Sequence, residues 1–339
     1  MWNGPVQVIV GPRENGVVEY GRDLASAVQE LDSEASVASA EDLPGVRAIA
    51  RRAERIHLHI SDRVFGTSAM DSADAVESLA QLTAVTVTLH DLPQTSDGAV
   101  NLVRRTDAYR RIVAAARGCV VGSRHEADIF AENLGRDLGS PLVVPLGVRP
   151  GRIVSARLPE RTAGEVAIAG YFYPGKGHRE VIQALAEMRE DGSPTRLTGL
   201  GAVSEGHEGD YRNLAGEARS VGIEFSMTGY LDRGEYRDRL VEAAVPVAAH
   251  QHMSASRSIL DWIEAGRRPL VPDTAYIREL AALRPGVLTV YGHGELRDAI
   301  GRAFADPDST GLEPGTDLGY SLDDAAAAYV RWWSNDVSW

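Results

Sequence analysis

The fold is decided by residues 168–178, which read Ile168-Ala169-Gly170-Tyr171-Phe172-Tyr173-Pro174-Gly175-Lys176-Gly177-His178. An apolar run at 166–169 predicts a buried strand, and the turn after it is rich in glycine and proline. Residues 179–188 then have the apolar spacing of one helical face. This order is typical of a phosphate site, because free N–H groups and the positive end of a helix dipole converge beside Lys176. An ordinary strand-to-helix turn with a surface lysine fits the same residues.

Composition limits the class of protein. The chain has 339 residues, enough for two domains with separate cores. Hydrophobic residues make up 44% and charged residues 24%, as in globular proteins. The formal net charge of −13 argues against non-specific binding to nucleic acid or to an anionic membrane. Cys119 is the only cysteine, so we expect neither a disulfide framework nor a cysteine-built zinc site.

The N-terminus has no basic segment followed by a long apolar run, and no apolar stretch approaches the length of a membrane span. We therefore expect a cytoplasmic protein without a membrane span. The sequence does not decide its oligomeric state.

Strands and helices alternate through residues 1–148. The expected strands are 6–10, 36–38, 55–60, 84–89, 119–122 and 142–145, and the expected helices are 17–31, 46–53, 72–82, 109–116 and 125–134. Such alternation predicts βαβ units on a parallel sheet. Ligands of these sheets bind outside the carboxyl ends of the strands, which directs attention to the loop at 11–16 and to His90. Gly16 in that loop would permit close approach of a ligand to the backbone, or make a plain turn.

After an irregular connection at 146–164 the alternation starts again. The expected strands are 166–169, 196–201, 223–228, 245–249, 269–271 and 286–291, and the expected helices are 179–188, 211–221, 235–243, 257–265, 276–282, 294–305 and 321–333. The fold class is therefore α/β, with two Rossmann-like, doubly wound parallel sheets facing a cleft. We place the N-terminal domain at 1–148, joined by a C-terminal helix at 321–339, and the second domain at 149–320.

Several short segments follow one another in the order found in one enzyme family. They are Thr88-Leu89-His90-Asp91-Leu92, Pro145-Leu146-Gly147-Val148, the stretch from Gly170 to Gly177, Gly229-Tyr230-Leu231, Pro269-Leu270-Val271 after Gly266, and Glu279-Leu280. In these segments the chain resembles a retaining glycosyltransferase of the two-Rossmann-domain GT-B type, in the large family four group. The resemblance implies that Lys176 contacts the donor diphosphate, that Gly229, Tyr230 and Leu231 line the nucleobase pocket, and that His90 lies near the transferred sugar.

The chain departs from the family at two positions of the donor site. The family's Glu-x7-Glu pair falls on Met253 and Asp261, and only Asp261 keeps a carboxylate that can accept hydrogen bonds from ribose hydroxyls. Tyr171 replaces the arginine that follows Gly170, which removes a fork-shaped phosphate donor. Arg257, at the start of the helix that carries Asp261, is our candidate for its substitute.

Other polar residues are secondary candidates. Ser254, Ser256 and Ser258 add hydroxyls around the start of the helix that carries Asp261, and Glu279 is placed to reach a sugar or a backbone N–H. His250 and His252 have metal-ligand spacing but no third ligand nearby, so we expect one of them to line the donor pocket instead. His57 and His59 alternate with apolar residues on a strand, and we expect both to be satisfied core or edge groups and not ligands.

The resemblance predicts a hexosyltransferase-like enzyme that moves a sugar from a UDP- or GDP-linked donor to a hydroxyl of a small molecule or glycan, with retention of configuration. The C-terminal domain would hold the donor and the N-terminal domain the acceptor. We expect no cofactor, since the nucleotide-sugar is a substrate, and no metal, since no Asp-x-Asp pair ends a strand. Met253 and Tyr171 leave two alternatives open: a non-catalytic nucleotide-sugar binder or partner subunit, and a nucleotide-sugar epimerase of the same fold.

Overall fold

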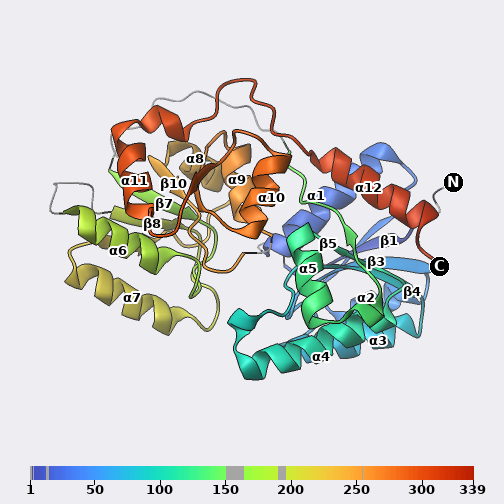
Figure 1. The fold of residues 1–339 in the computed structure, drawn as a ribbon. Helices are drawn as coiled ribbons and strands as arrows, with labels where there is room; N and C mark the ends of the chain where they lie inside the picture. Colours follow the sequence, from blue (N-terminus) through green and yellow to red (C-terminus); the bar gives the residue numbers. More distant parts are fainter. Residues whose placement is uncertain (1, 3, 13–14, 150–163, 190–195, 254) are drawn as a thin grey trace. The chain divides into compact units, whose positions relative to one another are not determined.

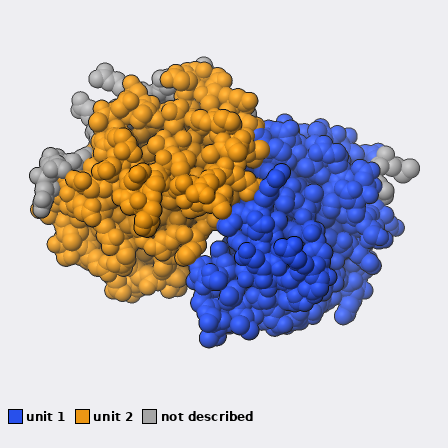
Figure 2. All heavy atoms as spheres, in the orientation of Figure 1, with its two compact units in different colours: residues 1–147, 320–339 blue, residues 148–319 orange. Residues whose placement is uncertain are grey.

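The structure is a computed structural model that describes residues 2, 4–12, 15–149, 164–189, 196–253 and 255–339. The chain divides into two compact units, which Figure 2 colours separately. Unit 1 contains residues 1–147 and 320–339, and unit 2 contains residues 148–319. These limits lie one residue from the boundaries expected from the sequence.

Unit 1 has a six-stranded parallel sheet with the strand order β2-β1-β3-β4-β5-β6. The strands are β1 (Val6–Val10), β2 (Val37–Ala40), β3 (Arg55–Ile60), β4 (Ala84–Leu89), β5 (Cys119–Val121) and β6 (Leu142–Val143). The helices are α1 (Gly16–Leu31), α2 (Leu43–Ala50), α3 (Ala69–Ala80), η1 (Thr95–Asp97), α4 (Ala99–Ala115), α5 (Arg124–Asn133), η2 (Arg136–Leu138) and α12 (Leu322–Asn335).

Helices cover both faces of this sheet (Figure 1). On one face α2, α3, α4 and α5 pack against the alternate strand residues Ile56, Leu58 and Ile60. On the other face α1 and α12 form a second cluster, which includes Leu24 and Trp333. Both faces of the sheet are buried, as is usual for parallel sheets, and His57, His59, Thr86 and Thr88 are buried polar residues of β3 and β4.

Unit 2 repeats the plan with the strand order β12-β11-β10-β7-β8-β9, again all parallel. The strands are β7 (Glu165–Ala169), β8 (Arg196–Leu200), β9 (Glu224–Met227), β10 (Val245–Val247), β11 (Leu270–Pro272) and β12 (Thr289–Tyr291). The helices are α6 (His178–Met188), α7 (Glu208–Ser220), α8 (Arg233–Glu242), α9 (Arg257–Glu264), α10 (Ala275–Leu283), α11 (Leu296–Ala305) and η5 (Pro307–Thr310).

The central strand β7 supplies both cores of unit 2. Val166 and Ile168 pack with α6, α7 and α11, whereas Ala167 and Ala169 pack with α8 and with Trp262 of α9. The prediction of two doubly wound parallel sheets is therefore confirmed.

The helix that differs most from the sequence prediction is α4. We expected a helix at 109–116, but α4 begins already at Ala99. Its buried residues begin at Ala108, while Val100 and Val103 in its first turns are exposed. The apolar spacing of a helix appears only where it packs, so the exposed first half of α4 gave no signal. No helix among the described residues is long and apolar enough to span a membrane.

Candidate functional site

The glycine turn after β7 is held against the end of β10. Gly170, Gly175 and Gly177 all have positive φ values, of 93°, 88° and 100°. A Cβ atom on Gly177 would lie 2.4 Å from the carbonyl oxygen of Ala249, so only glycine fits that contact. The backbone N–H of Gln251 also donates to the carbonyl of Gly175 at 3.0 Å. These contacts fix the position at which α6 begins.

Lys176 lies inside this turn and is buried, with 5% of its surface exposed. Its Nζ atom donates to Oγ of Ser258 at 2.9 Å and lies 5.6 Å from the centre of the Tyr173 ring. Burial lowers the pKa of Lys176 to about 8, although the charge of Asp261 opposes this shift. It is also the only lysine in the sequence. The alternative of a surface lysine is therefore wrong, while its role as a phosphate ligand stays a prediction.

Ser256 and Ser258 form the start of α9. Their hydroxyl oxygens lie 3.2 Å apart, and the backbone N–H of Ser256 donates to the hydroxyl of Tyr276 at 3.2 Å. Together with Lys176 they form a polar chain at the N-terminus of a helix, where a negative group is stabilised. Ser254, the third serine singled out in the sequence, lies outside the described residues.

Arg257 is engaged by carboxylates of its own helix. Its Nε atom lies 3.0 Å from Oδ1 of Asp261, and its Nη2 atom lies 2.5 Å from Oε2 of Glu264. The hydroxyl of Tyr236 donates to Oδ2 of Asp261 at 3.1 Å. Burial raises the pKa of Glu264, and the charge of Arg257 opposes that rise. A phosphate would have to compete with these two carboxylates for Arg257.

The sequence did not single out Glu264 or Tyr236. The signal for Glu264 was its spacing of seven residues from Arg257, two helical turns along one face. Tyr236 comes from α8, and no spacing in the sequence indicated its contact with Asp261.

The ends of β7, β8 and β9 lie side by side. A Cβ atom on Gly201, after β8, would lie 2.6 Å from the carbonyl oxygen of Gly170. The N–H of Gly201 donates to Oγ1 of Thr228 at 2.9 Å, directly before Gly229. The candidate nucleobase turn and the Lys176 turn are thus connected through Gly201.

The remaining donor-site candidates differ in exposure. Tyr230 is 59% exposed and Tyr171 is 37% exposed, whereas Leu231 and Glu279 are half-buried. Met253, at the position of the family's first glutamate, is buried. An apolar side chain therefore occupies the place where the resemblance implies a carboxylate.

Two buried histidines lie near Lys176. His178 packs between Phe172 and Phe225, and neither of its ring nitrogens has a partner among the described residues. Burial and the charge of Lys176 lower the pKa of His178 to about 3 and that of His250 well below its ordinary value. Both imidazoles are therefore neutral at neutral pH. The described residues contain no group of three or more metal-ligating side chains.

In unit 1, His90 follows β4 at the carboxyl end of the sheet. Its backbone N–H donates to the carbonyl of Ile60 at 3.0 Å, and its Nε2 atom lies 2.9 Å from Nδ1 of His59. Burial lowers the pKa of His90 to about 4. Gly16, expected in a loop, is instead the first residue of α1, where Asn15 caps the helix. Within the described part of that loop, Gly11 has a positive φ, of 105°.

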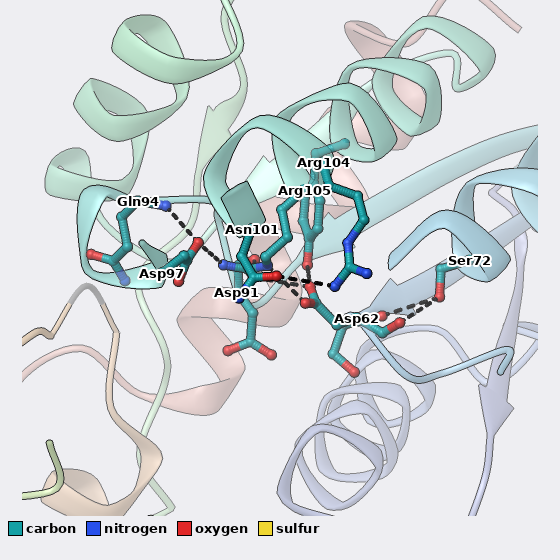
Figure 3. Close-up of polar contacts among 10 residues, drawn as sticks. Asp62, Ser72, Asp91, Gln94, Asp97, Asn101, Arg104 and Arg105 are labelled. Atoms are coloured by element: carbon teal, nitrogen blue, oxygen red, sulfur yellow. Dashed lines mark hydrogen bonds and ion pairs between the residues drawn. The ribbon is translucent and has the colours of Figure 1, made fainter. Parts of the chain in front are cut away.

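Arg105 of α4 anchors the loop after β4 (Figure 3). Its Nε and Nη2 atoms bond to the carboxylate of Asp62 at 2.7 Å and 2.9 Å, and Nη2 donates to the carbonyl of Asp91 at 2.6 Å. The third guanidinium nitrogen of Arg105, Nη1, donates to the carboxylate of Asp97. The hydroxyl of Tyr109 donates to the carboxylate of Asp62 at 2.9 Å. Burial alone would lower the pKa of Arg105, but the hydrogen bonds and charge of Asp62 raise that pKa above its ordinary value. The carboxylate of Asp91 points away from this network and is exposed.

No protein-family model matches the sequence, and no curated protein matches it. Solved structures do match the fold. Sucrose-phosphate synthase from Thermosynechococcus elongatus has a TM-score of 0.67 at 14% identity, over 98% of this chain and 96% of that one. HepE of Anabaena in complex with UDP and glucose has a TM-score of 0.65 at 15% identity, over 96% and 95%.

A third structure is an alpha-glucosyltransferase in complex with UDP-glucose and DNA containing an abasic site, with a TM-score of 0.60 at 10% identity over 97% and 95% of the two chains. These proteins are glycosyltransferases built from two Rossmann-like domains. The chain has the GT-B fold. At these identities the GT-B likeness shows the architecture, and the chemistry must be argued from the residues.

Proposed function

We propose that this protein is a retaining glycosyltransferase that moves a sugar from a UDP- or GDP-linked donor to a hydroxyl of a small molecule or glycan, in the cytoplasm. The observation that carries the proposal is the bond from Lys176 to Ser258, which places a buried cation at the N-terminus of α9. UDP and glucose in the HepE structure, and UDP-glucose in the alpha-glucosyltransferase structure, support UDP as the first nucleotide to test.

Unit 2 would hold the donor. Lys176 and the N–H groups at the start of α9 would stabilise the charge that grows on the leaving diphosphate. Asp261 would accept hydrogen bonds from the ribose, and the turn from Gly229 to Leu231 would line the base. Lys176 is mostly protonated at pH 7, because its pKa is about 8.

Unit 1 would bind the acceptor, and its His90 would lie near the transferred sugar. The sequence offers no obvious covalent nucleophile, so we expect front-side attack in which the leaving phosphate takes the acceptor proton. Transfer would then need no metal, since no Asp-x-Asp pair ends a strand.

A nucleotide-sugar panel tests the proposal. The protein is incubated with UDP- and GDP-linked sugars, with and without candidate acceptors, and the released nucleotide and the anomeric configuration of the product are measured. We expect nucleotide release that depends on the acceptor, and a product that keeps the donor's configuration. Inversion would overturn the retaining mechanism.

Buried Met253 favours one alternative, a nucleotide-sugar binder without transfer activity. The same panel separates transfer, binding without transfer and epimerisation. Tight binding with neither transfer nor hydrolysis would favour the binder, and an isomerised donor formed without an acceptor would favour an epimerase.

A further inference from the structure

Three histidines of unit 1 gather where β3 and β4 end. His57 and His59 lie on the same face of β3, because alternate residues of a strand share a face. Thr88 pairs with His59 in the register of β3 and β4, and His90 follows two residues later. The rings of His59 and His90 are stacked, with centres 5.2 Å apart and planes at 28°.

Both ring nitrogens of His57 have hydrogen-bond partners. Its Nδ1 atom lies 3.0 Å from Oγ1 of Thr86, and its Nε2 atom lies 3.0 Å from Oγ1 of Thr88. Thr88 in turn lies 2.7 Å from the hydroxyl of Tyr329. His57 is therefore satisfied within the core by Thr86 and Thr88, and His59 is the histidine that contacts His90.

The bond between His59 and His90 joins two neutral rings. Nδ1 of His59 lies 2.9 Å from Nε2 of His90. Burial lowers the pKa of His90 to about 4 and that of His59 well below its ordinary value. Each ring therefore carries one proton at neutral pH, and one of the two facing nitrogens must donate while the other accepts.

The surroundings of Nε2 of His59 indicate which nitrogen donates in the bond between His59 and His90. Nε2 of His59 is buried and has no partner within the part of the chain that the structure describes. A proton on that atom would leave a buried N–H donor unpaired, an arrangement that folded proteins avoid. With the proton on Nδ1, His59 donates to His90 and leaves only a lone pair without a partner. His90 must then carry its own proton on Nδ1.

We propose that His59 is a positioning residue that fixes the tautomer of His90, so that His90 presents an Nδ1–H donor. The consequence for catalysis rests on the proposed glycosyltransferase function. An Nδ1–H group donates a hydrogen bond to a sugar oxygen and has no lone pair to take a proton. His90 would therefore hold the transferred sugar and would not act as a general base through that atom.

Nuclear magnetic resonance of histidine labelled with ¹⁵N tests the tautomer directly, without donor or acceptor. Two-bond ¹H–¹⁵N spectra at pH 7.5 distinguish an Nδ1–H ring from an Nε2–H ring, and His90→Gln assigns the signal. We expect His90 of the unmodified protein to be the Nδ1–H tautomer. An Nε2–H signal from His90 would overturn the proposal, whatever the variants do.

Two variants of His59 sharpen the test. His59→Phe keeps an aromatic ring and removes the donor, so His90 should shift toward Nε2–H, the commoner tautomer of free histidine. His59→Asn places an amide N–H near the original Nδ1 and should restore the Nδ1–H tautomer. His90 remaining Nδ1–H in a folded His59→Phe protein would also overturn the proposal.

Activity separates this inference from the proposed function. If transfer from a UDP-sugar is found, His59→Phe should lower kcat about 5- to 10-fold, as for one lost hydrogen bond, and His59→Asn should recover it. The Kd for UDP should not change, since Lys176 and Asp261 are in unit 2. An Nδ1–H signal in a protein that transfers no sugar would support the tautomer assignment and refute the function.

Discussion

Lys176 and Ser258 are joined by a hydrogen bond of 2.9 Å, although 82 residues separate them in the sequence. The bond connects the turn after β7 to the first turn of α9, where the backbone N–H groups are free to bind an anion. A bound diphosphate would therefore meet a cation whose position is already fixed. Binding would then lose little conformational entropy of the Lys176 side chain.

Replacing this lysine should weaken nucleotide binding. Lys176→Met removes the charge and keeps an unbranched chain, and we expect the binding free energy of UDP to fall by about 1.5–3 kcal/mol, the range for a hydrogen bond to a charged group. Isothermal titration calorimetry measures the Kd. Ser258→Ala is the matched control, because it removes the partner but keeps the cation, and it should cost less. Equal affinity of Lys176→Met and the unmodified protein would remove Lys176 from the site.

The affinity for UDP should also depend on pH. Lys176 binds an anion only when protonated, and its folded-state pKa is about 8. The Kd should rise about tenfold per pH unit above pH 8. Lys176→Arg stays charged throughout and should remove this dependence. A constant Kd for the unmodified protein from pH 7 to pH 9.5 would contradict the prediction.

The single lysine also allows a chemical test. An acylating reagent for amines should modify only Lys176 and the N-terminus, because the sequence has no other lysine. We expect saturating UDP to protect Lys176 and to leave the N-terminus reactive, as mass spectrometry of peptides would show. If Lys176 reacts without UDP and reacts equally with UDP, the nucleotide binds elsewhere.

The sequence predicted the order of helices and strands better than the contacts between them. The strand, turn and helix around Lys176 follow from apolar spacing and from glycine, both of which are local signals. The burial of Lys176 is not local, because it depends on Ser258 and the start of α9. Arg105 shows the same limit. It stands beside Arg104 in the sequence, and only the rotation of α4 makes Arg105 half-buried and Arg104 exposed.

Two glycines of the turn provide a test of its packing. Gly175 and Gly177 both have positive φ, but a Cβ atom on Gly175 would meet nothing closer than 3.8 Å. Gly175→Ala should therefore cost only the backbone strain, about 1 kcal/mol. Gly177→Ala adds the collision with Ala249 and should cost about 3 kcal/mol. Differential scanning calorimetry measures both, and equal losses would mean that the contact with Ala249 is unimportant.

His178 should be a source of acid sensitivity in unit 2. Its folded-state pKa is about 3, below the unfolded value of about 6.5, so its contribution to stability is complete at pH 7 and is lost as the pH falls from 6.5 toward 3. His178→Phe keeps the aromatic contacts and removes two nitrogens that have no partner among the described residues. We expect it to raise the free energy of unfolding by about 1 kcal/mol at pH 7. At pH 5 the gain should be larger by about 2 kcal/mol. A gain that does not grow at pH 5 would contradict the lowered pKa.

Arg105 should matter more to unit 1 than its neighbour on α4. Its side chain is 13% exposed and bonds to Asp62, Asp97 and the carbonyl of Asp91, so Arg105→Ala removes the cation from both carboxylates and should cost about 2 kcal/mol. Arg104 is exposed and bonds to Asn101 at 3.2 Å, so Arg104→Ala should change stability by less than about 0.5 kcal/mol.

Urea unfolding followed by tryptophan fluorescence measures this difference in unit 1, because Trp2, Trp332, Trp333 and Trp339 all lie there and only Trp262 lies in unit 2. Arg105→Lys serves as the control for charge, since it keeps one cation but cannot bond to all three groups at once. We expect it to recover part of the loss. If Arg105→Ala and Arg104→Ala unfold at the same urea concentration, the Arg105 network does not hold the loop that carries His90.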